Sequence, residues 1–442
     1  MNQHKISLTT AILMNFNIMI GSGILIGPAI MAEKAGNASF LAWLLVALIF
    51  LPIVLSTVQM SRMCPGAGGF YAYAKEGLSI PAGYWSGWLY IVGYTFSFAV
   101  ELLALRSTLL TSLGENWFTM NPVIFNAGFT LAAVGLNLLG MKLFSRILNS
   151  LTVSKLLPLI VLILLIPMIY NPSFTITAHE LSMVPLALPF AIFGYLGFEY
   201  CCSISHLIEN SEKNAPLALL IGFFLTATIY SLFHFGLLNL MGPQALHEFG
   251  APSFAQFLNV PIPYLKSVLS YIIPLASVAT LFAGACGLLN ANSIMLNSMA
   301  HEKLFVIWPV LAQVSSLNRP WAALFIQGFV GFLIGTLLPN IEVVGNLCNM
   351  GVFLSFILPL CSLFAIQTRT GKQGNRLLTI FGLISAASLS IYSIFRLMSI
   401  SPLWSDRLFY LSPFIGLLVI GALIFRNRGD DFRKLDESIR RA

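Results

Sequence analysis

Long apolar segments recur along the chain, and they constrain its fold more than any other feature. Each is about 20 residues or longer, which is the length that a helix needs to cross the hydrocarbon core of a bilayer. Twelve can be placed, at residues 8–31, 40–63, 83–113, 122–139, 147–170, 184–205, 216–240, 264–299, 321–338, 343–366, 377–398 and 408–426. Because a segment in lipid must satisfy its own backbone hydrogen bonds, each is expected to be helical. We therefore predict an all-α membrane protein with twelve transmembrane helices.

The composition excludes a soluble globular protein. Hydrophobic residues make up 57% of the chain and charged residues 9%, whereas soluble domains average about 25% charged residues. The start of the chain is short and polar and leads into a segment long enough to span, so no cleavable signal is expected. The six cysteines show no metal-ligand spacing, and we expect neither a metal nor a cofactor.

The distribution of basic residues predicts the orientation of the chain. Of its 23 lysines and arginines, most fall in one set of connectors and in the two ends of the chain; the exceptions are Lys34, Arg106, Lys266, Arg396 and Arg407 near the other side, and Lys155 within a span. Basic loops face the cytoplasm, so both termini are expected there. The basic segment 426–441 fits a membrane surface, and no nucleic-acid partner is expected despite the net charge of +7.

Glycines interrupt two of the predicted spans. Gly21-Ser22-Gly23 lies in the middle of the first, and Gly194-Tyr195-Leu196-Gly197 lies in the sixth. A break at bilayer depth is tolerated only where it is buried in protein or lines a cavity, although small residues also allow close helix packing. Spans 1 to 5 and 6 to 10 run in opposite directions, so the breaks correspond in two inverted halves. Such paired breaks indicate the substrate site of a secondary transporter.

Three segments resemble hallmarks of bacterial amino acid permeases of the amino acid, polyamine and organocation (APC) superfamily. They are Gly21-Ser22-Gly23-Ile24, Pro65-Gly66-Ala67-Gly68-Gly69-Phe70-Tyr71-Ala72-Tyr73 and Gly197-Phe198-Glu199. Residues 209–216 are also similar to a family segment, with Ser211 in place of its usual proline. The resemblance covers essentially the whole chain. It implies one transporter domain in the bacterial inner membrane with an APC/LeuT-like fold: a 5+5 inverted repeat at about 8–170 and 184–366, peripheral helices at about 377–426, and a cytoplasmic tail at 427–442.

The resemblance implies a site for an amino acid at the two breaks. Backbone amides around Ser22, Gly23 and Ile24, with the Ser22 hydroxyl, would bind the substrate carboxylate at a helix N-terminus. The ammonium would bind carbonyl groups that are freed where the sixth span breaks, at Ile192, Phe193, Gly194 and Tyr195. Phe193 also matches the family position of an aromatic side chain that covers bound substrate, although it could equally be an ordinary core residue.

Two ionisable residues within spans are candidates for coupling or gating. Glu199 lies just beyond the second break, and intramembrane acids are functional candidates by default; burial favours its neutral form, which suits a proton-linked role. Lys155 matches a lysine that sodium-independent members of the family carry where sodium-coupled relatives bind an ion. The alternatives are a protonated Glu199 bonded only to a neighbouring helix, and a Lys155 that snorkels to the membrane surface.

Glu101 bears on the choice of substrate. It belongs to a polar stripe along the third span, which by family position helps to form the side-chain pocket. An ionised Glu101 facing inward would hold a cationic side chain, whereas Phe98 and Leu288, at neighbouring family positions, suit a neutral one. We expect a neutral amino acid, with a cationic amino acid or a polyamine as the alternative.

Taken together, these patterns predict secondary active transport of an amino acid by alternating access. The transporter would work as an exchanger or a proton-coupled symporter, independent of sodium and as a monomer or homodimer. Motifs of hydrolases and of Walker-type nucleotide-binding loops are absent from the sequence, so we do not expect an enzyme. A permease-like nutrient sensor is the competing function, but a sensor is expected to carry a longer regulatory tail.

Overall fold

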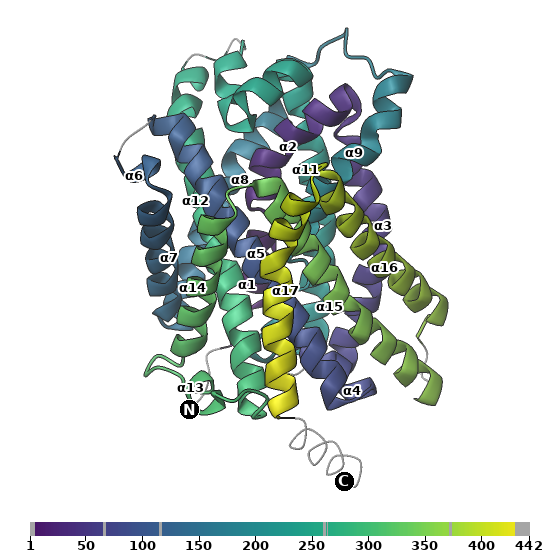
Figure 1. Ribbon diagram of the computed structural model, residues 1–442. Coiled ribbons are helices and arrows are strands. Elements are labelled where there is room, and N and C mark those ends of the chain that lie inside the picture. Colours follow the sequence, from purple (N-terminus) through teal and green to yellow (C-terminus); the bar gives the residue numbers. More distant parts are fainter. Residues whose placement is uncertain are drawn as a thin grey trace.

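Helices make up most of the computed structural model, which describes residues 5–64, 68–114, 117–259, 262, 264–370 and 374–428 (Figure 1). The α-helices are α1 (Leu8–Met19), α2 (Ser22–Ala35), α3 (Leu41–Met63), α4 (Gly69–Gly77), α5 (Ile80–Leu113), α6 (Trp117–Met120), α7 (Pro122–Leu138), α8 (Met141–Ile169), α9 (Ala178–Tyr195), α10 (Tyr200–Ser203), α11 (Ser211–Phe249), α12 (Leu265–His301), α13 (Trp308–Leu311), α14 (Trp321–Leu337), α15 (Ile341–Thr370), α16 (Arg376–Ser399) and α17 (Trp404–Asn427). Residues 65–67 of the glycine-rich loop motif and residues 429–442 of the predicted tail lie outside the described residues.

The prediction of twelve spans is confirmed. Within the described residues, ten helical segments are long and apolar enough to cross a bilayer, and α7 and α14 are two shorter apolar helices. The first span consists of α1 and α2 and the sixth of α9 and α10, so both are broken as predicted. The sixth begins earlier than expected because Thr177 and Glu180 form a capping box, in which Glu180 accepts from the Thr177 N–H at 2.8 Å.

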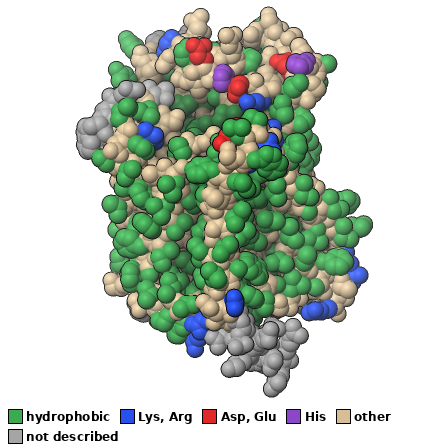
Figure 2. Space-filling view, viewed as in Figure 1, with side chains coloured by type: hydrophobic (Ala, Val, Ile, Leu, Met, Phe, Trp, Pro, Cys, Tyr) green, Lys and Arg blue, Asp and Glu red, His purple; other side chains and the backbone are tan. Residues whose placement is uncertain are grey.

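The outer surface of the bundle suits a bilayer. In Figure 2, hydrophobic side chains cover the broad middle of the visible face, and charged side chains gather toward its two ends. Large apolar residues of several spans are exposed, among them Leu48, Leu164 and Ile391. Exposed apolar area on this scale marks a surface that faces lipid or another protein.

Helix packing brings the two broken spans together at the centre. Helix α2 packs against α9, and the long helix α5 contacts both α12 and α15. In contrast, only 11% of the apolar window of α17 is buried, and this helix lies in front of the bundle in Figure 1. The breaks therefore lie inside the protein, the environment that an interrupted backbone at bilayer depth requires.

Candidate functional site

Lys155 binds the carbonyl groups that are left free at the first break. Helix α1 ends at Met19, so its last carbonyl groups have no partner in a following turn. The Lys155 ammonium, from α8, donates to the Asn17 carbonyl at 2.7 Å, to Asn17 Oδ1 at 2.9 Å and to the Ile20 carbonyl at 2.5 Å. Only 1% of Lys155 is exposed, so its side chain is held in the interior and does not snorkel to the surface.

The amide side of the same break is occupied by Glu101. Helix α2 begins at Ser22, whose N–H donates to Glu101 Oε1 at 3.0 Å and to Oε2 at 3.2 Å. The Ser22 hydroxyl donates to Oε1 at 2.9 Å. A carboxylate is favoured there because the helix N-terminus offers free N–H groups and the positive end of its dipole. The amide that was predicted to bind the carboxylate of a substrate thus binds a carboxylate of the protein.

Two glycines make the space that Glu101 fills. A Cβ atom at Gly21 would overlap Glu101 Oε1, and a Cβ atom at Gly284 of α12 would lie 3.3 Å from the carboxyl carbon. Lys155, across the break, attracts the Glu101 carboxylate electrostatically. The two charged side chains therefore bind opposite sides of the same helix break. Lys155 binds carbonyl groups at the end of α1, and Glu101 binds the first amide of α2.

The second break lies at residues 196–199, slightly later than predicted. Gly197 adopts a left-handed backbone, with φ of 94°, which glycine tolerates better than any other residue. The hydroxyl of Tyr94, from α5, accepts from the Gly197 N–H at 2.8 Å and donates to the Glu199 carboxylate. Glu199 is fully buried and lies within the break itself, where a single tyrosine joins it to the interrupted backbone.

Gly194 lies inside α9 and not in the break, and its role there is close packing. A Cβ atom on Gly23 would lie 2.7 Å from Gly194 Cα, and a Cβ atom on Gly194 would lie 2.6 Å from the Trp43 ring. Trp43 is itself fixed by its Nε1–H, which donates to His234 Nδ1 at 3.0 Å. Both interpretations of the glycines in the first span, a backbone break and close helix packing, therefore apply: Ile20 and Gly21 form the break, while Gly23 lets α2 touch α9.

Replacing Gly197 by alanine should lower the thermal stability of the purified protein. The left-handed conformation costs an L-residue about 1 to 2 kcal/mol, and the added Cβ would overlap the Ile18 side chain. Gly135→Ala in α7 is the matched control, because nothing lies within 4 Å of its Cβ position and alanine gains about 1 kcal/mol of helix propensity. We expect midpoints of thermal unfolding in detergent to shift in opposite directions. Equal shifts would contradict this account of the second break.

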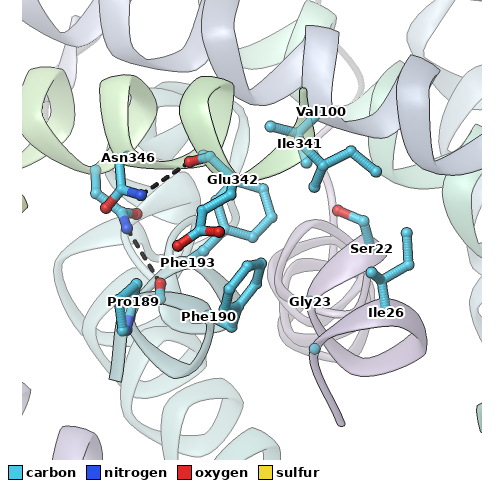
Figure 3. A pocket seen from close by; sticks show the side chains of 13 residues that line it. Ser22, Gly23, Ile26, Val100, Pro189, Phe190, Phe193, Ile341, Glu342 and Asn346 are labelled. Atoms are coloured by element: carbon cyan, nitrogen blue, oxygen red, sulfur yellow. Dashed lines mark hydrogen bonds between the residues drawn. The ribbon is translucent and has the colours of Figure 1, made fainter. Parts of the chain in front are cut away.

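A narrow pocket lies where α2, α9 and α15 meet, next to the first break (Figure 3). Its free volume of about 20 Å³ holds roughly one water molecule, so an amino acid could enter only if the helices move apart. Of the predicted residues, Ser22, Gly23 and Phe193 line it. Phe190, one turn before Phe193 on α9, adds a second aromatic ring to the same wall, as Figure 3 shows.

The facing wall of the pocket is a polar stripe of α15, whose residues were not among the predicted site residues. Glu342, Asn346 and Asn349 line the pocket, and their spacing of four and three residues places them on one helix face. The Asn346 amide donates to the Glu342 carbonyl at 2.8 Å, and the Asn349 amide donates to the Pro189 carbonyl at 3.2 Å. Arg396 lies 3.3 Å from Glu342. This regular spacing was a signal that could have found these residues.

Other predicted residues are buried nearby but do not line this pocket. The Phe98 ring lies against α14, since a Cβ atom at Gly331 would overlap it. Tyr195 is held by its hydroxyl, which donates to the Trp43 carbonyl at 3.0 Å. Three more predicted residues are at most 3% exposed: Ile24, Ile192 and Leu288. Ile24 lines a second, smaller cavity that is bounded by Lys155.

Arg319, which was not among the predicted residues, forms a buried hydrogen-bond network. It precedes α14, is 2% exposed, and donates from Nε to the Asn137 carbonyl at 2.6 Å and from a terminal nitrogen to Asn290 Oδ1. The Asn290 amide donates to the Tyr200 hydroxyl at 2.5 Å. Burial lowers the pKa of Arg319 to about 10, so it stays charged at neutral pH. The network joins α7, α12 and α10 just beyond the second break.

Comparison with known proteins agrees with this geometry. The profile of the amino acid permease family matches residues 6–424. An aspartate-proton symporter of Bacillus subtilis is 23% identical, over 85% of this chain and 75% of the relative. The serine/threonine exchanger SteT of the same organism is 21% identical, over 83% and 84%. A probable agmatine/putrescine antiporter of Lactococcus lactis is 23% identical, over 74% and 73%. The chain is an integral membrane protein that belongs to the amino acid permease family.

Proposed function

We propose that this permease moves its substrate across the bacterial inner membrane as a secondary active transporter that works by alternating access. The observation that carries the proposal is the meeting of two broken spans, α1–α2 and α9–α10, beside a pocket whose free volume of about 20 Å³ holds roughly one water molecule. Broken helices of this kind form substrate sites near the middle of the bilayer, and one half rocks against the other around that site. Both chain termini face the cytoplasm in this proposal, as the basic residues indicate.

Transport is independent of sodium in this proposal. A sodium ion at the first break would need oxygen ligands, and the carbonyl groups of Asn17 and Ile20 are the oxygens that the broken helix frees. Lys155 donates to both carbonyl groups, at 2.7 and 2.5 Å, and brings one positive charge of its own. The Lys155 ammonium therefore provides the positive charge at these carbonyl groups that a bound sodium ion would otherwise provide.

The coupling reaction is either exchange or proton symport, with Glu199 as the acid. Glu199 lies in the second break, is fully buried, and is bonded to the Tyr94 hydroxyl, which also holds the Gly197 amide. Gain or loss of a proton at Glu199 would alter these bonds at the point where α9 and α10 separate. Buried acids of this kind mark proton pathways in transporters.

The pocket favours the alternative substrate class, a cationic amino acid or a polyamine, over the neutral amino acid that the sequence favours. Phe98 supported a neutral side chain, but it packs against α14 outside the pocket. Glu342, Asn346 and Asn349 are the polar residues of the pocket wall on α15, and they suit a cationic group. The relatives differ among themselves: their names record aspartate, serine or threonine, and agmatine or putrescine.

A transport panel in proteoliposomes tests the proposed function. The purified protein is reconstituted, and uptake of the twenty amino acids and common polyamines is measured with and without a pH gradient. We expect saturable exchange of at least one compound, at the same rate when N-methylglucamine replaces sodium. Protein-free liposomes are the control. Sodium-dependent uptake would contradict the role of Lys155, and no transport of any compound would contradict the proposal as a whole.

The same preparation separates a transporter from a sensor. A compound that raises the midpoint of thermal unfolding but never crosses the liposome membrane would indicate a receptor that binds without cycling.

A further inference from the structure

Glu101 already binds the Ser22 amide and hydroxyl, the groups that were predicted to bind the carboxylate of a substrate. Three hydrogen bonds from Ser22 hold its two oxygens, at 2.9 to 3.2 Å. Gly21 and Gly284 leave room for this carboxyl group, because a Cβ atom at either position would press on it. Glu101 is 3% exposed. An amino acid entering the pocket would thus find the amide end of α2 bound to an anion of the protein.

The pocket beside the N-terminus of α2 presents hydrogen-bond acceptors. Asn346 and Asn349 use their amide N–H groups on backbone carbonyls, and the Oδ1 atom of each is buried without a hydrogen-bond partner. Glu342 adds a carboxylate, which Figure 3 shows beside the rings of Phe190 and Phe193. The lining residues, all within the described part of the chain, include no lysine, arginine or histidine. Arg396 pairs with Glu342 from outside the lining, and the unpaired amide oxygens of the wall are the atoms that can receive N–H donors.

The electrostatics of the pocket select the same kind of ligand. Ser22, which holds Glu101, also lines the pocket, so the Glu101 carboxylate lies behind the inner end of the pocket, balanced in part by Lys155. The second carboxylate, that of Glu342, is paired with Arg396 at 3.3 Å. Charge interactions are strong in an interior of low dielectric constant, and like charges brought together discriminate against the wrong partner. The faces of Phe190 and Phe193 provide a further attraction for a cation within about 6 Å of a ring centre.

We propose that the substrate is an organic amine without an α-carboxylate, such as an alkyl monoamine or diamine. Glu101 then supplies from the protein the carboxylate that an amino acid would bring with it. The ammonium group binds among Glu101, the free amide oxygens of Asn346 and Asn349, and the aromatic wall. This inference rests on the proposed transport function and specifies its substrate class.

A different role for Glu101 makes the opposite predictions. If Glu101 is a plug that leaves Ser22 when an amino acid arrives, the carboxylate of the substrate replaces it and its removal should improve amino acid binding. If Glu101 belongs to the amine site, its removal should weaken amine binding.

Matched pairs of compounds test the inference in the wild-type protein. Each amine is compared with the amino acid that carries the same side chain: putrescine with ornithine, cadaverine with lysine, agmatine with arginine, and tyramine with tyrosine. Counterflow in proteoliposomes gives kcat/KM for each. We expect the preferred amine to exceed its parent amino acid by about tenfold or more, because the added carboxylate meets like charge.

Variants of Glu101 give a second, independent measurement. Glu101→Gln keeps the shape but removes the charge, and should lower amine counterflow by about tenfold, because charge-assisted hydrogen bonds are roughly twice as strong as neutral ones. Glu101→Asp should keep part of the activity. Glu248→Gln, on an exposed position of α11, is the control and should match the wild type. Thermal unfolding shows whether each variant folds.

The outcomes are distinguishable. Transport of parent amino acids in preference to every amine by the wild type would overturn the inference while leaving the transport function in place. A Glu101→Gln variant that binds amino acids more tightly and transports amines unchanged would overturn it in favour of the plug. Absence of transport for both kinds of compound would overturn the proposed function and the inference together.

Discussion

Lys155→Met should abolish transport while leaving the protein able to insert and purify. The substitution removes the ammonium that holds the carbonyl groups of Asn17 and Ile20 and that attracts Glu101 across the break. Leaving the two buried carbonyl groups without a donor costs about 1 to 3 kcal/mol each, and a total of about 3 kcal/mol corresponds to more than a 100-fold change. We therefore expect counterflow in proteoliposomes to fall by about two orders of magnitude or to below detection.

Lys142→Met is the matched control for this prediction. It makes the same chemical change on the same helix, α8, at an exposed position, and should leave transport unchanged. Adding Glu101→Gln to Lys155→Met removes the second charge as well, so the double variant should recover part of the lost thermal stability. Purely additive shifts in the unfolding midpoint would show that Lys155 and Glu101 do not interact, and full transport by Lys155→Met would contradict its role at the break.

The sequence allowed the spans and the first break to be predicted because their signals are local. A span must be apolar over about 20 residues, and the Gly21-Ser22-Gly23 break lies in the middle of such a segment. The second break was predicted slightly early because glycine has two uses. Gly197 takes a left-handed backbone, whereas Gly194 makes room for Trp43, and a sequence does not distinguish a glycine that turns from one that packs.

Partnerships between helices could not be predicted from one sequence. Glu101 was a candidate for the substrate pocket if its side chain faced inward, but it does not line the pocket, and its carboxylate binds the Ser22 amide and hydroxyl. That choice depends on the space left by Gly284, about 180 residues away in the chain and so invisible to any local pattern. Arg319 is a similar case, because its partners Asn137 and Asn290 come from two different helices.

Glu199→Gln should eliminate accumulation of substrate driven by a pH gradient. It should leave substrate exchange largely intact when the pH is equal on both sides of the membrane. Glutamine keeps the size of the side chain and can still bond the Tyr94 hydroxyl, but it cannot release a proton near neutral pH. With one proton per substrate, a gradient of one pH unit is worth about 1.4 kcal/mol and supports roughly tenfold accumulation. We expect the wild type to approach that ratio and the variant to stay near one.

Tyr94→Phe distinguishes proton transfer by Glu199 from the structural role of the hydrogen bonds around it. It removes both the donor to Glu199 and the acceptor of the Gly197 N–H, so it should slow exchange and accumulation alike, in contrast to Glu199→Gln. Because both substitutions act on one hydrogen-bonded chain, their combined effect should be smaller than the sum of the two. Tenfold accumulation by Glu199→Gln would show that another group carries the proton. A wild type that exchanges substrate without accumulating it would be an exchanger, and Glu199 would then have only a structural role at the second break.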